Sequence, residues 1–156
     1  ILRFFNVYGN KSNAVVAKFL AQYLQNKHIT IYGNGNQSRD FVHVLDVVSV
    51  FRKIINKKIK SNIFNIGSSN SVSINKLKNL IIKSKKFVHL DKRFDDIEVS
   101  ISNIDKAKKI LKWHPKIIFK DGLDRMKNDD SIRLLSKKLD TIQKQKKLIK
   151  FFNKKK

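Results

Sequence analysis

The stretch Ile29-Thr30-Ile31-Tyr32-Gly33-Asn34-Gly35-Asn36, followed two residues later by Arg39-Asp40-Phe41-Val42-His43-Val44, decides the fold. β-branched and aromatic residues predict a short strand over residues 28–32 and a second strand at residues 41–44. Between them, glycine and asparagine tolerate positive φ and predict a turn. Asp46 is expected to cap a helix that runs to residue 55, because its carboxylate can accept a hydrogen bond from a free backbone N–H group. The unit is therefore strand, turn, strand and helix.

Strands and helices alternate in both directions from this unit. Upstream, residues 1–6 predict a buried strand, and Asn13 is expected to cap a helix that ends near Leu24. Downstream, the pattern predicts a strand over 63–66, a helix from Ser73 or Asn75 to about 83, a strand over 87–90, a helix from Ser102 or Asn103 to Leu111, and a helix from Asp121. Such alternation is typical of an α/β fold. We expect residues 1–123 to form one domain and residues 124–156 to form a Lys-rich helical tail.

The composition excludes several classes of protein. The chain has 156 residues, of which 41% are hydrophobic and 30% charged, so a folded domain is expected rather than disorder. No apolar run is long enough to span a bilayer, and residues 1–9 lack the basic and apolar regions of a signal peptide, so none is expected there. The absence of cysteine removes disulfides, thiolate catalysis and cysteine-based zinc sites, and is compatible with a cytoplasmic location. The four histidines are scattered, so no metal centre is expected.

A formal net charge of +23 leaves two interpretations open. Nucleic-acid binding is one of them, because basic proteins neutralise phosphates. The other is compositional drift in an AT-rich genome, since Lys dominates over Arg and both Asn and Ile are abundant. We favour drift, with weak and salt-sensitive binding of polyanions as its consequence and no specific nucleic-acid or membrane partner.

Four segments, in this order, resemble the extended short-chain dehydrogenase/reductase family that acts on nucleotide sugars. They are Leu2-Arg3-Phe4-Phe5-Asn6-Val7-Tyr8-Gly9; the stretch from Ile29 to Val44 with Asp46-Val47-Val48; Phe64-Asn65-Ile66-Gly67-Ser68; and Arg93-Phe94-Asp95-Asp96 with Asp105-Lys106-Ala107 and Leu111-Lys112-Trp113-His114-Pro115-Lys116. The resemblance implies the C-terminal substrate-binding portion of an extended Rossmann-type fold, with the N-terminal cofactor half absent. The chain begins at Ile1 rather than at Met, which also suggests a fragment, a truncated reading frame or a trimmed chain.

The resemblance also implies a set of substrate-binding residues. Arg39 and Arg93 would clamp the diphosphate, because a guanidinium fork matches phosphate oxygens and stays charged. Asp96 would accept from the ribose hydroxyls, and backbone groups of Ile31 and Tyr32 would contact the base. The remaining members of the set are Phe5, Asn6, Asn13 and Ala14 near the phosphates or sugar, and Ser100, whose small size would leave room for an N-acetyl group.

Each of these residues also has a purely structural interpretation. Arg39 could form a surface salt bridge, and Arg93 with its neighbouring aspartates could be a solvated ion cluster. Asn13 could be only a helix cap, and Tyr32 only a core anchor. We assign Trp113 to packing. The order of the four motifs favours the binding interpretation for Arg39, Arg93, Asn6 and Asp96.

The chemistry of the family is not expected in this chain. No G-x-x-G-x-x-G motif occurs, so the site for the NAD of a complete enzyme is mostly missing. Tyr23 and Lys27 match the family's Tyr-x-x-x-Lys by letters only, because they follow the first strand instead of preceding it; we interpret them as an ordinary helix pair. No catalytic residue is therefore assigned. An N-terminal Rossmann half or a second copy is the expected protein partner, and without it the uncovered sheet predicts poor solubility.

Three classes of function remain open from the sequence. The leading one is the substrate-binding portion of an NAD-dependent 4-epimerase of nucleotide sugars, with a UDP-hexose or UDP-N-acetylhexosamine as substrate. The alternatives within the class are a 4,6-dehydratase or reductase fragment. A non-catalytic nucleotide-sugar-binding remnant or split subunit, and a basic nucleic-acid protein, are the other classes.

Overall fold

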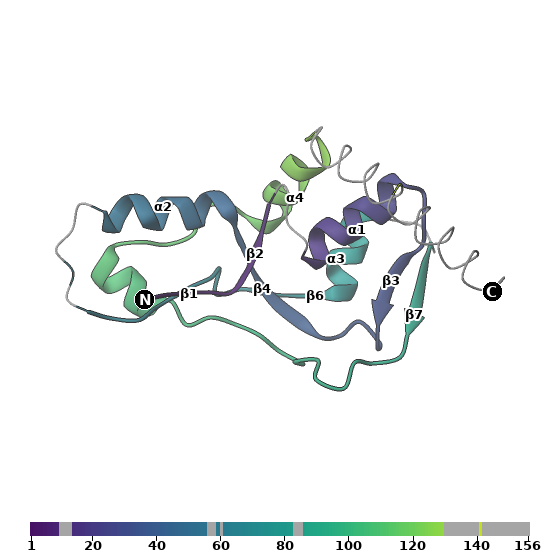
Figure 1. Cartoon of the computed structure of the whole chain (residues 1–156), viewed down its shortest axis with the longest axis horizontal. Coiled ribbons are helices and arrows are strands. Elements are labelled where there is room, and N and C mark those ends of the chain that lie inside the picture. Colours follow the sequence, from purple (N-terminus) through teal and green to yellow (C-terminus); the bar gives the residue numbers. More distant parts are fainter. Residues whose placement is uncertain (10–13, 56–58, 60, 83–85, 130–140, 142–156) are drawn as a thin grey trace, which may run out of the picture.

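The structure, a computed structural model, describes residues 1–9, 14–55, 59, 61–82, 86–129 and 141 (Figure 1). Over these residues the elements are, in order, β1 Leu2–Phe4, β2 Asn6–Tyr8, α1 Val15–Leu24, β3 Ile29–Tyr32, β4 Ser38–His43, α2 Val44–Ile54, β5 Phe64–Ile66, β6 Ser71–Ser73, α3 Ile74–Ile81, β7 Phe87–Leu90, the π-helix η1 Ala107–Leu111, and α4 Phe119–Lys127. The expected α/β class is confirmed. No helix in the described ranges is long and apolar enough to cross a membrane.

Strand β4 connects the parts of the molecule, because its two halves pair with different strands. Its C-terminal half runs parallel to β2, and its N-terminal half runs antiparallel to β6. Two further parallel pairs, β1 with β5 and β3 with β7, flank this three-stranded sheet. Figure 1 shows β4 crossing between the part that holds α2 and the part that holds α1, α3 and β3.

Alternation along β4 sends neighbouring side chains into two separate cores, as the period of two of a strand requires. Phe41 faces the first core, which α1, β3, α3 and α4 enclose. Val42 faces the second core, which lies between α2, β5 and η1. In the first core the ring of Phe41 stacks on Phe119, with ring centroids 5.0 Å apart. In the second core Trp113 is 1% exposed, and its Nε1–H donates to Ser49 Oγ at 2.8 Å, so its packing role is confirmed.

The first strand is not buried as predicted. It breaks at Phe5, whose N–H donates to the carbonyl of Ile66, and β1 pairs only with β5 among the described residues. Phe4 is therefore 39% exposed. The outer face of α2 continues this apolar surface, with Leu45, Val48 and Phe51 each at least 43% exposed. The ring of Phe51 lies 6.0 Å from that of Phe4, so the two exposed aromatic side chains are neighbours on this surface.

The structure changes two of the predicted helix starts and keeps a third. The cap of α2 is His43 instead of Asp46, and the carboxylate of Asp46 instead accepts the N–H groups of Lys116 and Ile117 at 2.9 and 3.1 Å. The first residue before α1 is Ala14, which makes no side-chain cap hydrogen bond, and the predicted cap Asn13 lies outside the described residues. Ser73 caps α3 as predicted, through a hydrogen bond from the Lys76 N–H to its Oγ at 3.1 Å.

The helix predicted from Ser102 or Asn103 to Leu111 is present from Asp105 onward, and its residues 107–111 form the π-helix η1. Ser102 is 3% exposed because both its N–H and its hydroxyl bond to the carboxylate of Asp40. Asn103, one of the two predicted caps, holds the start of this helix, because its Oδ1 accepts the N–H of Asp105 at 2.9 Å.

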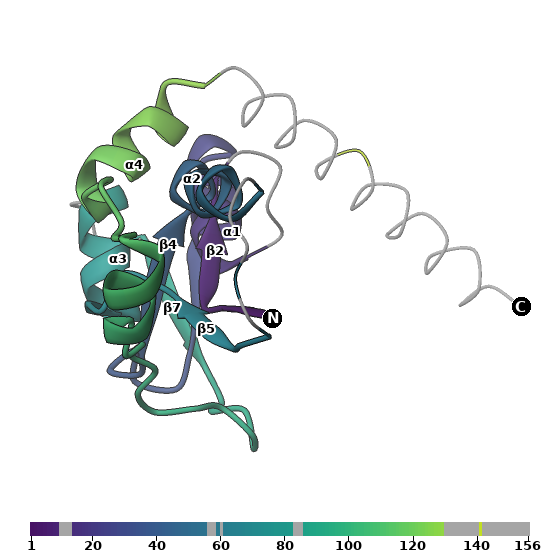
Figure 2. The ribbon, with the colours of Figure 1, turned by 90° about the vertical axis from the view of Figure 1, so that its left-hand side faces the viewer.

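Helix α4 crosses the predicted boundary between residues 123 and 124. Leu123 and Met126 lie on opposite sides of that boundary, and both are buried in the first core. The Lys-rich tail predicted beyond them falls almost entirely outside the described residues, so its helical character stays a prediction. Figure 2 shows α4 beside α3 at one side of the molecule.

The imidazole cap of α2 predicts a pH-dependent stability. Burial lowers the pKa of His43 below its usual 6.5, with Arg125 adding to this and Asp46 opposing it. The Nδ1 of His43 must stay unprotonated to accept the N–H of Leu45 at 3.2 Å. Because the folded-state pKa is depressed, the stabilisation is complete above about pH 6.5 and is lost as the pH falls below that value.

The expected result is a drop in the free energy of unfolding between pH 7.5 and pH 5.5, of the order of one helix cap, about 1 kcal/mol. Urea unfolding followed by circular dichroism measures it. His43→Asn is the matched control, since asparagine caps a helix without titrating. An equal drop in that variant would assign the pH dependence to other groups.

Candidate functional site

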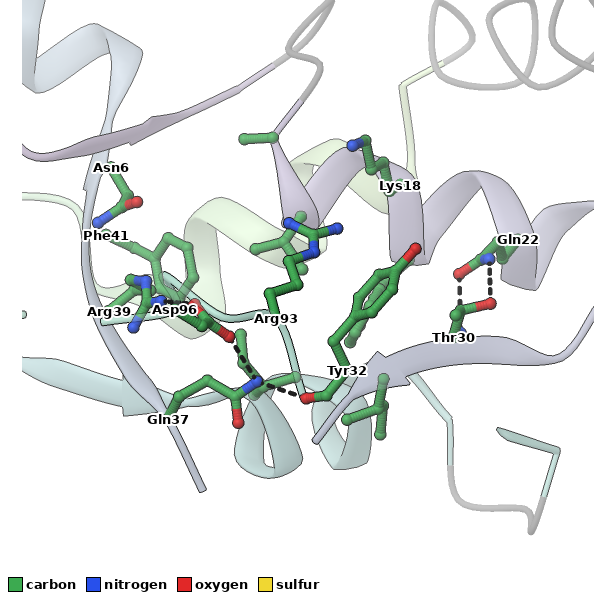
Figure 3. Close-up of a pocket in the computed structure, with 15 residues that line it drawn as sticks. Asn6, Lys18, Gln22, Thr30, Tyr32, Gln37, Arg39, Phe41, Arg93 and Asp96 are labelled. Carbon is green, nitrogen blue, oxygen red and sulfur yellow. Dashed lines mark hydrogen bonds and ion pairs between the residues drawn. The ribbon is translucent and has the colours of Figure 1, made fainter. Parts of the chain in front are cut away.

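A pocket of about 400 Å³ lies where α1, β3, β4 and the segment around residues 93–96 meet (Figure 3). Helix α1 contributes a stripe at helical spacing, namely Val15, Lys18, Phe19 and Gln22. From β3 come Thr30, Ile31 and Tyr32, and from β4 come Arg39 and Phe41. Asn6, Ala14, Gln37, Ile74, Arg93 and Asp96 complete the lining.

The alternation of β4 aims Arg39 into this pocket and Asp40 behind it. The guanidinium of Arg39 forms an ion pair with Asp96, and it also donates to the carbonyl of Ile97. A further N–H donates to the carbonyl of Ser38 at 2.8 Å. The two charged side chains are only 15% and 16% exposed. Screening by water is therefore reduced, and the guanidinium is held in one orientation at the pocket wall.

Asp40 organises the back of the site from a fully buried position. Its carboxylate accepts the N–H groups of Ser68, Ser69 and Ser102, at 2.6, 3.0 and 2.9 Å. The hydroxyls of Ser68 and Ser102 also donate to it. Position 67, next to the groups that surround Asp40, requires glycine, because a Cβ there would collide with the Oγ of Ser102. Arg39 thus stands on a strand that is fixed to two distant loops.

Arg93 lines the pocket from the same segment as Asp96, the ion-pair partner of Arg39. Its guanidinium lies over the ring of Tyr32, 3.9 Å from the ring centroid, in a cation–π contact. No ion pair among the described residues involves Arg93 or Lys18. Figure 3 shows Arg93 and Tyr32 between Arg39 and the Gln22–Thr30 pair. The described lining carries the cations Lys18, Arg39 and Arg93 against the single carboxylate of Asp96, which suits an anionic ligand.

One edge of β3 faces away from its partner strand and toward the pocket. The N–H groups of Ile29 and Gly33 donate to β7 and its preceding residue, so the alternation of a parallel ladder turns the backbone groups of Thr30 and Tyr32 the other way. The N–H of Thr30 donates to Gln22 Oε1 at 3.2 Å, and the carbonyl of Tyr32 accepts from Gln37 Nε2 at 2.6 Å. Between them, the carbonyl of Thr30 and the N–H of Tyr32 bond to no described residue.

The structure brings most of the predicted binding residues to this one pocket. These are Asn6, Ala14, Ile31, Tyr32, Arg39, Arg93 and Asp96. Phe5 and Ser100 do not line it, and Asn13 lies outside the described residues. The backbone groups on the pocket edge of β3 belong to Thr30 and Tyr32 rather than to Ile31, because the period of a strand selects every second residue.

Four polar lining residues, Lys18, Gln22, Thr30 and Gln37, were not predicted from the sequence. Two of them follow simple spacing rules. Thr30 shares a strand face with Tyr32, and Gln22 lies one helical turn beyond Lys18. Gln37 had no signal of its own, because its role depends on the turn that places it beside Tyr32 and Asp96.

The residues of this chain do not fit a dinucleotide cradle. Gly33 and Gly35 lie in the turn after β3, with φ of 67° and 77°, and no helix follows that turn. Gly9, Gly67 and Gly122 each pack against other side chains. Tyr23 and Lys27 lie outside the pocket lining, and Lys27 follows the end of α1, so the two are not a pair within one helix as interpreted from the sequence.

Comparisons with known proteins converge on one family. Residues 1–67 match the model of the NAD dependent epimerase/dehydratase family. The chain is 33% identical over 135 residues to UDP-glucuronate 4-epimerase of Thermodesulfobacterium geofontis, covering 82% of this chain and 42% of that protein. It is 33% identical over 141 residues to UDP-glucuronic acid decarboxylase 3 of Arabidopsis thaliana, covering 86% of this chain and 41% of that protein.

A solved structure shows the same arrangement of elements. The crystal structure of UDP-glucuronic acid 4-epimerase from Bacillus cereus, in complex with UDP-glucuronic acid and NAD, superposes with a TM-score of 0.77 at 28% identity. The match covers 86% of this chain and 45% of that one. The chain thus spans about two fifths of the length of the curated relatives it matches.

Proposed function

Because this chain belongs to the NAD-dependent epimerase/dehydratase family, we propose that its pocket binds the nucleoside diphosphate part of a nucleotide sugar. The observation that carries the proposal is the convergence of Arg39 and Arg93 on one pocket that also holds Asp96. Two guanidinium groups can pair with the two phosphates of a diphosphate, and each charge-assisted hydrogen bond is worth about 1.5–3 kcal/mol.

The remaining groups of the pocket support the other parts of such a ligand. Asp96 offers a carboxylate to the ribose hydroxyls next to the arginines. The carbonyl of Thr30 and the N–H of Tyr32, which bond to no described residue, match the N3–H donor and O4 acceptor of a uracil ring. The Nδ2 of Asn6 donates to the carbonyl of Asp40 at 3.3 Å and lies at the arginine end of the pocket, where phosphate or sugar would follow.

In the complete protein we assign this chain to the substrate-binding portion of a UDP-sugar 4-epimerase. The similarity to UDP-glucuronate 4-epimerase supports that reaction, and the similar likeness to a UDP-glucuronic acid decarboxylase makes another reaction on the same substrate class the second candidate. NAD would be held by residues outside this chain, and an N-terminal Rossmann half or a second copy would cover β1 and α2. Ser100 as a gate for N-acetylated sugars stays a prediction.

Ligand binding to the full 156-residue chain tests the proposal. We expect a UDP-sugar to bind about tenfold or more tightly than UMP, since the second phosphate adds charge-assisted hydrogen bonds. Isothermal titration calorimetry with UDP-glucuronic acid, UMP and random single-stranded DNA, at about 50 and 200 mM salt, measures the order of the three affinities. DNA binding that collapses with salt while UDP-sugar binding persists supports the nucleotide-sugar site. Equal affinity for UMP and the UDP-sugar would reject the diphosphate clamp.

A further inference from the structure

The turn between β3 and β4 contains Asn34-Gly35, the one place in the chain where glycine follows asparagine. In this dipeptide the side-chain amide can be attacked by the next backbone nitrogen, because glycine has no Cβ to block the approach. Asn34 is exposed, and Gly35 has a φ of 77°. The turn therefore presents an asparagine amide to solvent directly before a residue without a side chain.

The contacts of the turn leave the reacting groups of this dipeptide available. The Oδ1 of Asn34 accepts the N–H of Asn36 at 2.9 Å, which assigns the other amide atom as Nδ2 and polarises the side-chain carbonyl. No described residue accepts a hydrogen bond from Asn34 Nδ2 or from the N–H of Gly35. Within the described part of the chain, the leaving group and the attacking nitrogen thus both lack a hydrogen-bond acceptor.

A hollow of about 360 Å³ adjoins the exposed side of this turn. The ammonium of Lys92 and the carboxylate of Glu98 form an ion pair there at 3.0 Å. The hollow gives ammonia a way out and water a way in, and the positive charge of Lys92 favours an anion that forms beside it. The described residues that line it are Gly33, Asn34, Asn36, Gln37, Lys92, Glu98 and Val99.

We propose that Asn34 is a self-modification site, at which the side-chain amide is lost and aspartate or isoaspartate is formed. The nitrogen of Gly35 gives up its proton to solvent and attacks Asn34 Cγ. The new N–Cγ bond forms, the Cγ–Nδ2 bond breaks, and Nδ2 takes up a proton and leaves as ammonia. Water then opens the cyclic imide: cleavage between Gly35 N and Cγ gives aspartate, and cleavage between Gly35 N and the backbone carbonyl carbon gives isoaspartate. One water is consumed, and no oxidant or reductant is needed.

The modification has a consequence for the neighbouring pocket. Isoaspartate lengthens the main chain between Tyr32 and Gln37, because the chain then runs through the Cβ of residue 34. Gln37 Nε2 donates to the carbonyl of Tyr32 at 2.6 Å and to Asp96 Oδ2 at 3.2 Å (Figure 3). These two bonds join the turn to the pocket, so we expect ligand affinity to fall as the protein ages. This consequence rests on the proposed function, whereas the modification does not.

Peptide mapping of the full chain at neutral pH follows the reaction without any ligand. Trypsin releases residues 28–39 as one peptide, because Lys27 precedes it and Arg39 ends it. The peptide contains Asn34 and Asn36, and fragmentation assigns the gain in mass from exchange of NH2 for OH to one of them. Asn36 is the internal control, since Gln37 follows it and its Oδ1 accepts Asn75 Nδ2 at 3.2 Å. We expect Asn34 to convert first among all asparagines, with isoaspartate detected by isoaspartyl methyltransferase labelling.

Two variants test the roles of the amide and of the cation. Asn34→Gln should abolish the reaction at this position, because the larger ring that glutamine would form closes far more slowly. Lys92→Met should lower the rate about two- to fivefold, the size of one exposed charge interaction. Lys108→Met is the matched control, because Lys108 is also an exposed lysine paired with a carboxylate, at 3.6 Å from Asp105, and lies outside the hollow. Equal rates in Lys92→Met and wild type would remove Lys92 from the mechanism.

The outcomes separate the modification from the function of the pocket. If Asn34 stays intact in the folded chain but converts in chain unfolded by urea, the fold protects the amide and the proposal is overturned. Calorimetry with UDP-glucuronic acid should show weaker binding by aged wild type than by fresh wild type, and no change on ageing of Asn34→Gln. Fresh chain that binds no UDP-glucuronic acid overturns the proposed function and leaves the modification standing. Equal affinity of fresh and modified chain would overturn the link between the turn and the pocket.

Discussion

Replacing Asp40 by alanine will unfold the chain under conditions in which wild type is folded. The carboxylate is 0% exposed and accepts five hydrogen bonds from the described residues Ser68, Ser69 and Ser102. Its removal leaves the backbone N–H groups of Ser68 and Ser102 without partners, at about 1–3 kcal/mol each, whereas the N–H of Ser69 keeps its hydrogen bond to Ser102 Oγ at 3.2 Å. We expect a loss of about 4 kcal/mol in the free energy of unfolding, a large part of the roughly 5–15 kcal/mol typical of a domain.

Urea unfolding followed by tryptophan fluorescence measures this loss, because Trp113 is the only tryptophan and lies in the second core. Asp91→Ala is the control, since Asp91 is exposed and surface changes of this kind usually stay within about 0.5 kcal/mol. Asp40→Asn should fall between the two, because an amide can accept some of the hydrogen bonds but not all. A variant Asp40→Ala as stable as wild type would show that the loops hold together without the carboxylate.

Arg39→Ala will weaken UDP-sugar binding about 100-fold. The guanidinium lines the pocket, and two lost charge-assisted hydrogen bonds to a phosphate amount to roughly 3 kcal/mol. The change also releases Asp96 from its ion pair, which places an unopposed carboxylate beside the diphosphate. Arg39→Lys keeps the charge but not the planar fork, so we expect an intermediate loss of about tenfold.

Uridine, which has no phosphate, distinguishes this effect from general damage to the pocket. Titration calorimetry with UDP-sugar and with uridine should show the loss for the first ligand only. Arg52→Ala provides the control for net charge, because Arg52 is an exposed residue of α2 far from the pocket lining. Equal losses for both ligands in Arg39→Ala would mean that Arg39 shapes the pocket instead of binding phosphate.

The parts of the fold that the sequence predicts are those set by local chemistry. Strand β3 and its Gly-Asn turn follow from residue type, and Ser73 caps α3 because its hydroxyl suits a helix start. Strand β6 was not predicted, since Ser-Val-Ser has no strand-like pattern and forms by pairing with β4. The cap of α2 was not predicted either, because it too depends on tertiary contacts: hydrogen bonds draw Asp46 toward Lys116.

For the site, motif resemblance located Arg39, Arg93 and Asp96 and missed Lys18, Gln22, Thr30 and Gln37. Arg39 and Arg93 stand out in the sequence because each lies within a motif whose place in the order points to an anionic ligand. Gln22 and Thr30 are ordinary residues of a helix and a strand, and their role emerges only where α1 packs on β3. Asp40 belongs to a motif, but nothing in the sequence indicates that loops 28 to 62 residues away would surround it.

Those sequence separations bear on the order in which the molecule assembles. The hydroxyl and amide groups that surround Asp40 come from positions 68, 69 and 102, so the chain must be synthesised through residue 102 before the cage can close. Until then only the groups of Ser68 and Ser69 can reach the carboxylate of Asp40. Local elements such as α1 can form earlier, but loop closure over such distances is slow. The strand that presents Arg39 therefore reaches its final position late, only after the segment that carries Arg93 and Asp96 has already been made.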